Sequence, residues 1–341
     1  MSNLKSEMLA KIADKSAVIG IVGLGYVGLP LATEFAKSGY KTIGFDVQEK
    51  KVALVNEGHN YIGDIVDDVF KEVVASGMLS ATNDFSFIKD VDAVAICVPT
   101  PLDKYQQPDI SYVKGSAESV AAHAHKGMLV VLESTTYPGT TEELLKPIFE
   151  NTGLVCGEDF YLAFSPERVD PGNKQYKTKN TPKVIGGCGK DSTEVAAALY
   201  RNVLEGGVYE VSSPAVAEME KLLENTYRNI NIGLANEMAI ICNRMGINVW
   251  EVIDAAKTKP YGFQAFYPGP GLGGHCIALD PIYLTWKARE FDYHTRLIET
   301  SGEINTAMPE YVVDRAMKIL NRNKIAMNGA NVLVLGVAYK N

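Results

Sequence analysis

A glycine-rich turn near the N-terminus constrains the fold more than any other feature of the chain. Gly23, Gly25 and Gly28 follow an apolar, partly β-branched run over residues 18–22, and helical apolar spacing follows over residues 29–38. A strand, this turn and a helix in that order form a dinucleotide-binding fingerprint. Its first glycine permits a tight turn, the second lets a pyrophosphate approach the backbone, and the third lets helix and strand pack closely.

The residues around this turn specify the dinucleotide further. Asp46 ends a second predicted strand over residues 41–46, where its carboxylate can accept hydrogen bonds from the adenosine ribose. A carboxylate there repels a 2′-phosphate, so NAD is favoured over NADP. Tyr26 and Val27 lie within the turn and are predicted to contact the same cofactor. The alternative is a glycine turn that binds no ligand.

Further apolar strands alternate with helical segments through the first half of the chain. We predict strands over residues 93–98, 128–133, 160–164 and 183–185, and a helix from Thr140. This alternation predicts an α/β fold, a Rossmann-like doubly wound parallel sheet. Thr100 and Thr135 each follow a strand, where a hydroxyl can reach a bound dinucleotide. As isolated residues, they fit a turn or helix-cap role better than a ligand-binding role.

The second half of the chain is predicted to be helical. Residues 214–245 show one uninterrupted helical pattern with a broad apolar face. Lys221, Asn225 and Arg228 fall on one side of this helix, either as a functional set or as a solvated polar face. A helix of this length suits pairing across a two-fold axis, so we expect a homodimer or higher homo-oligomer.

A glycine-rich segment over residues 261–281 carries the most reactive residue types. It is predicted to be neither helix nor strand, and it contains Cys276 with Asp280 four positions later. A cysteine held where ligands can approach closely is a candidate nucleophile, although the residues alone leave a structural role equally open. His275 has no second His or Cys at ligand spacing, so we expect no metal site. The remaining cysteines are predicted to be structural: Cys97, Cys156, Cys188 and Cys242.

Composition excludes several classes of protein. The 341-residue chain has a net charge of −8 and no basic run, which disfavours nucleic-acid binding. No stretch approaches the roughly 20 apolar residues of a membrane span, and the N-terminus lacks a secretory signal. The five cysteines form no C-x-x-C pair, so a reduced, cytoplasmic protein is expected.

Several segments together resemble the UDP-glucose/GDP-mannose dehydrogenase family. The matching stretches are GLGYVGLP at 23–30, VPTP at 98–101, EST at 133–135, SPER at 165–168, KLLENTYR at 221–228, GGHC at 273–276 and GVAYK at 336–340. The resemblance implies a NAD-binding domain over residues 1–210 and a central helical domain over 211–325 that carries the cysteine loop. Residues 326–341 would then begin a UDP-binding domain with a second Rossmann-like fold.

The resemblance also implies a four-electron oxidation of a UDP-sugar C6 hydroxyl to a carboxylate, with NAD as the oxidant. Cys276 becomes the nucleophile that carries the aldehyde as a thiohemiacetal and then as a thioester. The other residues implied in catalysis are Lys221 and Asp280 in proton transfer, Lys221 and Asn225 at the oxyanion, Glu167 beside water, and Thr135 near the reacting centre. Lys51 and Thr100 are implied at the cofactor, together with Thr135. Substrate contacts are implied for Glu167, Arg168, Val169, Lys221, Asn225, Arg228, Phe266, Tyr267, Gly273, His275 and Lys340.

The substrate branch depends on segments that differ within this family. Residues 165–173 and 268–276 look like the branch that acts on UDP-N-acetylhexosamines. His275 and Leu279 replace the Tyr and Lys that are usual in the UDP-glucose branch. We favour UDP-N-acetylglucosamine, with UDP-N-acetylmannosamine, UDP-N-acetylgalactosamine and UDP-glucose as alternatives. A role in uronic-acid precursors of a surface polysaccharide is a hypothesis from the resemblance alone.

The end of the chain departs from the family pattern. Residues 331–339 are predicted to form the first strand of the third domain, and roughly 90 further residues would complete it. We therefore expect NAD binding with weak or absent turnover. Two other hypotheses remain, a two-electron dehydrogenase of the hydroxy-acid type and an inactive NAD-binding or oligomerisation module.

Overall fold

The computed structural model describes residues 3–170, 172–173, 175–274 and 276–335. The chain forms two compact units, Met1–Lys221 and Leu222–Asn341, and each is described by itself. The helix α8 (Pro214–Met245) contributes residues to both, and its bounds agree with the predicted helix. The three-domain division expected from the sequence stays a prediction.

The first unit is built on one sheet with the strand order β3-β2-β1-β4-β5-β6-β7-β8. From β3 to β6 every pair is parallel, whereas β7 runs antiparallel to β6 and β8 parallel to β7. The strands are β1 (Ile19–Val22), β2 (Thr42–Phe45), β3 (Leu79–Thr82), β4 (Ala93–Ile96), β5 (Leu129–Leu132), β6 (Tyr161–Phe164), β7 (Lys183–Gly187) and β8 (Val208–Val211). The predicted α/β class and doubly wound, mostly parallel sheet are confirmed.

Sequence patterns missed the two outer strands, β3 and β8. In β3, Ser80 is exposed and Thr82 is only half-buried. In β8, Tyr209 and Glu210 are exposed and the two end residues are half-buried. Strands at a sheet edge are covered less completely than central ones, so they lack the continuous apolar run that identified the others. The sequence pattern therefore does not distinguish β3 and β8 from the polar segments around them.

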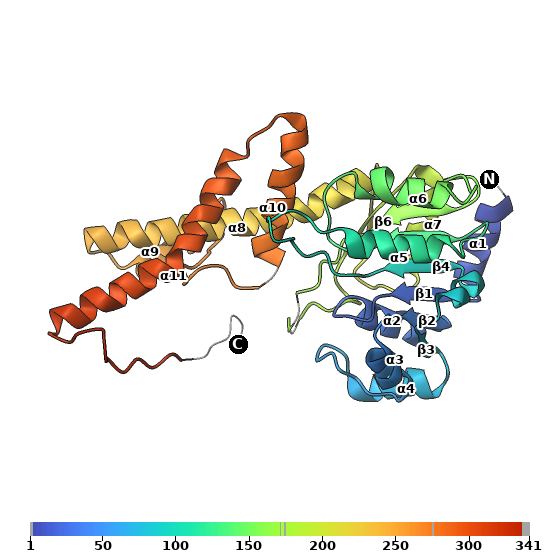
Figure 1. The fold of residues 1–341 in the computed structure, drawn as a ribbon, viewed down its shortest axis with the longest axis horizontal. Helices are drawn as coiled ribbons and strands as arrows, with labels where there is room; N and C mark the ends of the chain where they lie inside the picture. The colour runs from blue at the N-terminus through green and yellow to red at the C-terminus, as the bar shows by residue number, and fades with distance from the viewer. Residues whose placement is uncertain (1–2, 171, 174, 275, 336–341) are drawn as a thin grey trace. The chain divides into compact units, whose positions relative to one another are not determined.

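Alternate residues of the central strands form two separate cores, one on each face of the sheet. Ala93 and Ala95 of β4 belong to one core, while Val94 and Ile96 belong to the other. The first core is closed by α1 (Asn3–Ala13), α2 (Gly28–Lys37), α4 (Asp67–Ala75) and α7 (Lys190–Arg201), and the second by η1 (Phe85–Asp90), α5 (Ser111–Ala121) and α6 (Lys146–Glu150). Helices thus cover both faces of the sheet (Figure 1), which is why its strands are apolar on both sides.

Short helices complete the first unit. They are α3 (Glu49–Asn56) after β2 and the π-helical turn η2 (Thr140–Leu145), which runs directly into α6. The predicted helix from Thr140 is therefore present, with its first turn wider than an α-helix.

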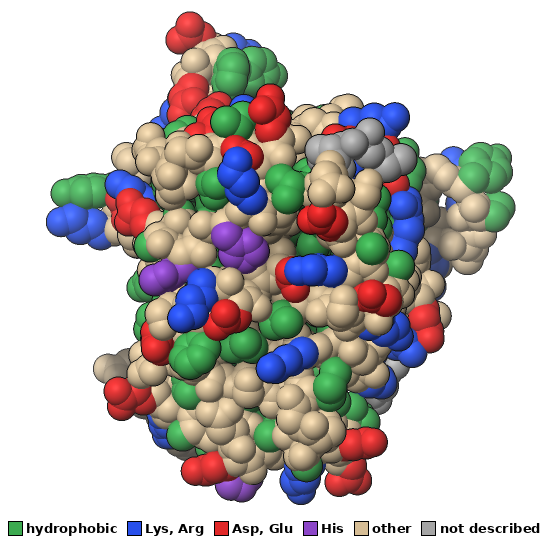
Figure 2. Space-filling view, turned by 90° about the vertical axis from the view of Figure 1, so that its right-hand side faces the viewer, with side chains coloured by type: hydrophobic (Ala, Val, Ile, Leu, Met, Phe, Trp, Pro, Cys, Tyr) green, Lys and Arg blue, Asp and Glu red, His purple; other side chains and the backbone are tan. Residues whose placement is uncertain are grey.

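Over the face drawn in Figure 2, acidic and basic side chains are interspersed rather than gathered by sign.

The second unit contains helices and irregular segments. Besides most of α8, it contains α9 (Val249–Ala256), α10 (Cys276–Ala288), η3 (Arg289–Phe291) and α11 (Arg296–Arg322). One apolar cluster among its described residues centres on Cys242, Val249 and Ile253. Polar contacts add to it: the Asn305 side chain donates to the Asn229 carbonyl at 3.1 Å, and Asn236 donates to Asn305 at 2.8 Å.

The strand predicted over residues 331–339 is not observed in its described part. Residues 331–335 have no regular secondary structure, and Leu333 and Leu335 are each more than four-fifths exposed. A strand forms only where a neighbouring strand takes up its backbone hydrogen bonds, and residues 331–335 pair with none of the strands described. Residues 336–339 lie outside the described residues. Among the helices described, none is long and apolar enough to cross a membrane.

Close packing between α8 and α11 gives a test of the second unit. A Cβ on Gly233 would lie 2.3 Å from the Ser301 Oγ, which also hydrogen-bonds the Asn229 carbonyl at 3.2 Å. We expect Gly233→Ala to displace that hydroxyl and lower the free energy of unfolding by about 1–3 kcal/mol. Thermal unfolding, with hydrogen exchange along α8 and α11, measures the effect.

The matched control is Gly302→Ala on α11. A Cβ on Gly302 meets no atom within 4 Å, so alanine there should stabilise the helix by about 0.5–1 kcal/mol. Equal stability of the two variants would contradict the packing described here.

Candidate functional site

The first part of the candidate site is the turn between β1 and α2. Gly23 has φ +93°, and a Cβ there would lie 2.5 Å from the Cys97 carbonyl oxygen. A Cβ on Gly28 would lie 1.9 Å from the Gly23 carbonyl oxygen, so only glycine fits either position. A Cβ on Gly25 would meet nothing within 4 Å, which leaves open space for a phosphate against this backbone. In the same turn Tyr26 is exposed and Val27 half-buried.

Asp46 lies at the end of β2, where the sequence predicted it. Its buried carboxylate accepts from the Leu24 backbone N–H at 2.9 Å and from the Gln48 backbone N–H at 2.9 Å. Lys51 lies 3.1 Å from the same carboxylate, so two polar residues predicted at the cofactor are in direct contact. The carboxylate also ties the glycine turn to β2, a structural role that the sequence did not indicate.

Thr100 and Thr135 follow neighbouring strands, β4 and β5, whose ends are held together by one hydroxyl. The Ser134 Oγ accepts from the Val98 backbone N–H at 2.9 Å and donates to the Val98 carbonyl at 2.7 Å. Both threonines thus lie at the carboxyl edge of the sheet, beside the point where the strand order reverses between β1 and β4. Open α/β sheets bind their ligands at that edge.

Glu218, near the start of α8, fixes the loop that follows Thr135. Its carboxylate accepts from the Gly139 N–H at 2.6 Å, from the Thr141 N–H at 2.9 Å and from the Thr141 hydroxyl at 2.7 Å. Burial raises the pKa of Glu218, and these hydrogen bonds oppose the rise. Sequence analysis missed this residue because its partners lie more than 70 positions earlier in the chain.

A buried charge cluster lies behind the same edge of the sheet. The Lys183 Nζ lies 2.5 Å from the Glu133 Oε2 and 4.0 Å from the Glu167 Oε2, and the Tyr200 hydroxyl donates to Glu133. Burial lowers the pKa of Lys183, but the two carboxylates outweigh it and raise the pKa overall. Burial raises the pKa of Glu133, and Lys183 opposes that rise. The cluster therefore keeps a cation beside Glu167, a predicted catalytic residue.

The sequence contained only a weak signal for this cluster. Glu133 belongs to a quoted segment, and Lys183 is a charged residue at the start of an apolar strand. A charge next to an apolar run is usually an exposed strand end, whereas Lys183 is only 5% exposed. Their pairing across 50 positions required the fold.

The segment after β6 carries three residues predicted at the substrate. The Glu167 Oε1 accepts from the Val169 backbone N–H at 2.6 Å, which orients the carboxylate. Arg168 donates to the Pro182 carbonyl at 3.0 Å and lies 3.5 Å from Glu220 of α8. Lys221, the next residue along α8, is buried.

In the second unit, two predicted catalytic residues meet directly. The Asn225 Nδ2 donates to the Asp280 Oδ2 at 2.5 Å, and both side chains are buried. Asp280 lies one helical turn after Cys276, the first residue of α10, and the Cys276 side chain is exposed. The partial positive charge of a helix N-terminus favours an anion at this sulfur.

The glycine-rich segment is irregular over residues 261–274, as predicted. The prediction was wrong for residues 276–281, which form the first turns of α10 because their backbone N–H and carbonyl groups continue into the helical hydrogen-bond pattern of this segment. Phe266 packs edge-on against Tyr227 of α8 at a ring-centre distance of 5.9 Å. Tyr267 instead stacks on Trp250, and its hydroxyl donates to Asp254 at 2.8 Å.

The remaining predicted substrate residues differ in how far they are exposed. Gly273 is half-buried, and Arg228 is exposed although Lys221 and Asn225 on the same helix are buried. His275 and Lys340 lie outside the described residues. Within the described part of the chain, no group of three or more His, Cys, Asp or Glu side chains is arranged to hold a metal ion.

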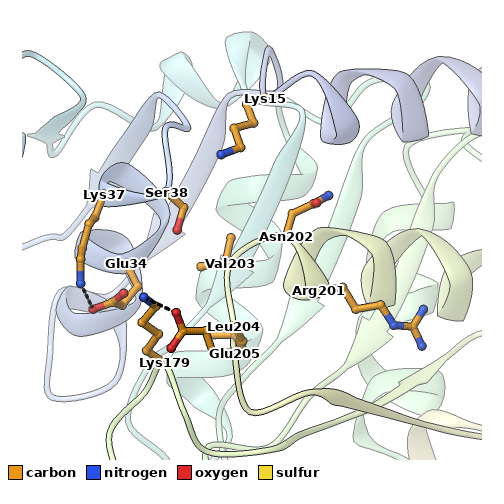
Figure 3. Close-up of a pocket in the computed structure, with 10 residues that line it drawn as sticks. All are labelled: Lys15, Glu34, Lys37, Ser38, Lys179, Arg201, Asn202, Val203, Leu204 and Glu205. Atoms are coloured by element: carbon orange, nitrogen blue, oxygen red, sulfur yellow. Dashed lines mark hydrogen bonds and ion pairs between the residues drawn. The ribbon is translucent and has the colours of Figure 1, made fainter.

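A separate pocket of about 350 Å³ lies on the first unit (Figure 3). Its lining includes Lys15 before β1, Ser38 before β2 and Leu204 before β8, so it faces the amino ends of strands. Most of its cations are already paired: Lys37 with Glu34 at 3.4 Å, Lys179 with Glu205 at 2.6 Å, and Arg201 with Glu210 at 2.5 Å. This pocket is therefore distinct from the nucleotide-binding edge.

Comparison with known protein families identifies the same family for both parts of the chain. Residues 17–204 match the NAD binding domain of the UDP-glucose/GDP-mannose dehydrogenase family, and residues 215–307 match its central domain. The chain is 39% identical to the UDP-N-acetyl-D-glucosamine 6-dehydrogenase of Pseudomonas aeruginosa, over 96% of this chain and 76% of that protein. It is 38% identical to the UDP-N-acetyl-D-mannosamine dehydrogenase of Pyrococcus horikoshii, over 94% of this chain and 76% of that protein.

Solved structures give the same result. The structure of the UDP-D-ManNAc dehydrogenase from Pyrococcus horikoshii superposes with a TM-score of 0.85 and 38% identity. It covers 90% of this chain, which in turn covers 72% of that protein.

The buried cluster around Lys183 gives a test by stability. Lys183→Met leaves the Glu133 carboxylate buried without its cation, which should lower the free energy of unfolding by about 3–5 kcal/mol near pH 7. Without Lys183, burial holds the pKa of Glu133 above its value of 4.5 in an unfolded chain. The loss should therefore be full above the folded-state pKa and shrink as the pH falls through it toward 4.5. Urea unfolding across this range measures it.

Two variants serve as controls. Lys190→Met removes a lysine that is 87% exposed, and should change the stability by less than about 0.5 kcal/mol. Adding Glu133→Gln to Lys183→Met removes the uncompensated charge and should restore most of the loss. A pH-independent loss in Lys183→Met would show that packing, not charge, explains it.

Proposed function

The chain belongs to the UDP-glucose/GDP-mannose dehydrogenase family, whose members are NAD-dependent oxidoreductases of nucleotide sugars, and from this membership we propose a specific reaction. The reaction is the four-electron oxidation of the C6 hydroxyl of a UDP-N-acetylhexosamine to a carboxylate. The observation that carries it is the side-chain set at the start of α10: an exposed Cys276, and Asp280 one turn later in contact with Asn225. A dehydrogenase that stops at a ketone or aldehyde has no need of a nucleophilic thiol.

The first unit fits the cofactor of this family. The open space at Gly25, the glycine-only positions 23 and 28, and the carboxylate of Asp46 match what a dinucleotide requires. NAD, when bound, supplies the hydride acceptor for both oxidations. The Lys51 cation beside Asp46 completes the proposed adenosine end, and Thr100 and Thr135 are proposed to contact the same cofactor.

The first oxidation requires removal of a proton from the C6 hydroxyl. We assign this to Lys221, or to a water held by Lys221 and Asp280. Asp280 is buried and hydrogen-bonded to Asn225, so its carboxylate is held in one orientation. A base that is held in place transfers the proton without first being ordered.

The second oxidation requires the aldehyde to become tetrahedral first. The Cys276 thiolate adds to the aldehyde carbon, and its carbonyl oxygen takes a proton to give a thiohemiacetal. Loss of hydride and of that proton gives a thioester, and water then cleaves it to the carboxylic acid and the thiol. Asn225 uses one N–H for Asp280, which leaves its second N–H for the developing oxyanion beside Lys221. Glu167, oriented by the Val169 N–H, is proposed to position the water.

The substrate proposed is UDP-N-acetylglucosamine. Relatives include dehydrogenases named for N-acetylglucosamine and for N-acetylmannosamine at nearly the same identity, 39% and 38%. These names and the 165–173 and 268–276 segments support the N-acetylhexosamine class, and within that class UDP-N-acetylglucosamine is our proposal. Arg168, Arg228 and Phe266 are proposed to contact the substrate. The cytoplasmic location and the polysaccharide role stay predictions.

We expect two NADH per sugar oxidised, at whatever rate, when the purified chain is given NAD and UDP-N-acetylglucosamine. UDP-N-acetylmannosamine, UDP-N-acetylgalactosamine and UDP-glucose are assayed in parallel. Cys276→Ser should yield at most one NADH per sugar, with an aldehyde that hydroxylamine traps, because serine forms no readily oxidised thiohemiacetal. NADH absorbance and mass spectrometry of the sugar give both quantities.

Cys156→Ser under reducing conditions is the matched control, since it removes a thiol outside the proposed catalytic set. One NADH per sugar from the unchanged chain would favour the two-electron dehydrogenase. No NADH from a folded chain that still binds NAD would favour the NAD-binding module. Reaction of UDP-glucose alone would overturn the substrate assignment.

We also propose that the protein is a homodimer that pairs through α8. Large apolar side chains are exposed along this helix at helical spacing: Leu223, Leu234, Ile241 and Met245. An apolar stripe of this kind is typical of an interface.

Light scattering should give a mass of twice 37.1 kDa for the unchanged chain. Leu234→Glu should shift the mass toward the monomer because it places a charge in the stripe. Lys71→Glu, on an exposed position of α4, is the charge-changing control and should remain dimeric. A monomeric unchanged chain would contradict the proposal.

A further inference from the structure

Two cysteines that are 32 positions apart lie along the same flank of β6. Cys156 forms an isolated β-bridge with Phe160 through the backbone, and the Gly157 N–H donates to the Phe160 carbonyl at 2.8 Å. The Cys188 N–H donates to the Leu162 carbonyl at 2.8 Å. The backbone carbonyls of alternate strand residues point to the same side of the strand, so those of Phe160 and Leu162 do so here. Cys156 and Cys188 are therefore neighbours on that side, separated by two residue steps along β6. That spacing is about 6.6 Å, within the Cα separation that a disulfide spans.

The side chains lie on one face as well as on one flank. Phe160 and Leu162 belong to the same buried cluster, and Cys156 and Cys188 both pack against it. Each thiol shifts the pKa of the other, and both side chains are partly exposed. In contrast, Cys97 and Cys242 are buried. The pair is therefore both close enough to bond and open to a small reagent.

The surroundings make the two thiols unequal. The neighbouring Cys188 thiol lowers the pKa of Cys156, burial opposes this, Lys146 supports it, and Glu150 and Glu142 oppose it. The Cys156 thiol, together with burial, raises the pKa of Cys188. We therefore take Cys156 as the attacking thiol and Cys188 as the thiol beside it, an order that the two single Cys→Ser variants test.

We propose that Cys156 and Cys188 form a thiol–disulfide exchange site for low-molecular-weight disulfides. The Cys156 thiolate attacks the reagent disulfide, which forms a mixed disulfide and releases one thiolate of the reagent. Cys188 gives up its proton and attacks the Cys156 sulfur, which forms the Cys156–Cys188 disulfide and releases the second reagent thiol. Two protein thiols are oxidised and one reagent disulfide is reduced to two thiols. This inference is independent of the proposed dehydrogenase reaction.

Oxidised glutathione is the probe, with alkylation of remaining thiols and peptide mapping by mass spectrometry as the readout. The unchanged chain should give a peptide pair linked through Cys156 and Cys188, with no glutathione on either, and dithiothreitol should reverse it. Cys188→Ser should stop at the mixed disulfide, with at least about tenfold more glutathione on Cys156 than on the buried Cys97. Cys156→Ser should give neither the link nor early modification of Cys188.

Cys97 and Cys242 report on folding in every sample, because both are buried and should stay unmodified while the chain is folded. If Cys97 and Cys242 become modified in Cys188→Ser, that variant is replaced by Cys188→Ala, in which both must again stay unmodified. Persistent glutathione on Cys156 of the unchanged chain, without the link, would overturn the proposal. Equal modification of Cys156 and Cys97 in the folded Cys188 variant would also overturn it.

Discussion

The parallel pairing of β1 with both β2 and β4 is the constraint on which the first unit depends. Parallel strands need crossover connections, and the helices of those connections cover both faces of the sheet. Because the chain leaves β1 for β2 on one side and later returns to place β4 on the other, the strand order reverses between β1 and β4. The glycine turn and the loop with Thr100 therefore open at the same edge, which is where a dinucleotide finds backbone N–H groups and space.

Charge placed inside this unit follows the same geometry. Glu133 directly follows β5 and Lys183 begins β7, and the two meet because β6 pairs with both strands. Burying a carboxylate or an ammonium group alone would cost several kcal/mol of desolvation free energy. Each charge is therefore buried together with its partner, and the Tyr200 hydroxyl donates a further hydrogen bond to Glu133. The cation also lies 4.0 Å from Glu167, which couples a structural cluster to a proposed catalytic carboxylate.

The second unit is stabilised differently. One apolar cluster among its described residues contains Cys242, Val249 and Ile253, and a network of Asn and Ser side chains connects α8 with α11. Hydrogen bonds between buried amides require specific geometry, so they hold these helices in one register, which apolar packing alone does not specify. The same logic holds at the proposed site, where Asn225 and Asp280 orient each other one turn from Cys276.

Several local elements of this protein were determined by sequence alone. The glycine positions at 23, 25 and 28, the carboxylate of Asp46, the long helix over 214–245 and the irregular segment before Cys276 all follow from residue type and spacing, because each depends on backbone conformation or local periodicity. Only the tertiary structure decided which distant residues meet: Lys183 with Glu133, Glu218 with the loop after Thr135, and Cys156 with Cys188. It also showed residues 331–335 without strand structure, since a strand depends on a partner rather than on its own residues. Contacts between segments far apart in the chain are set by strand order and helix packing, which local sequence does not encode.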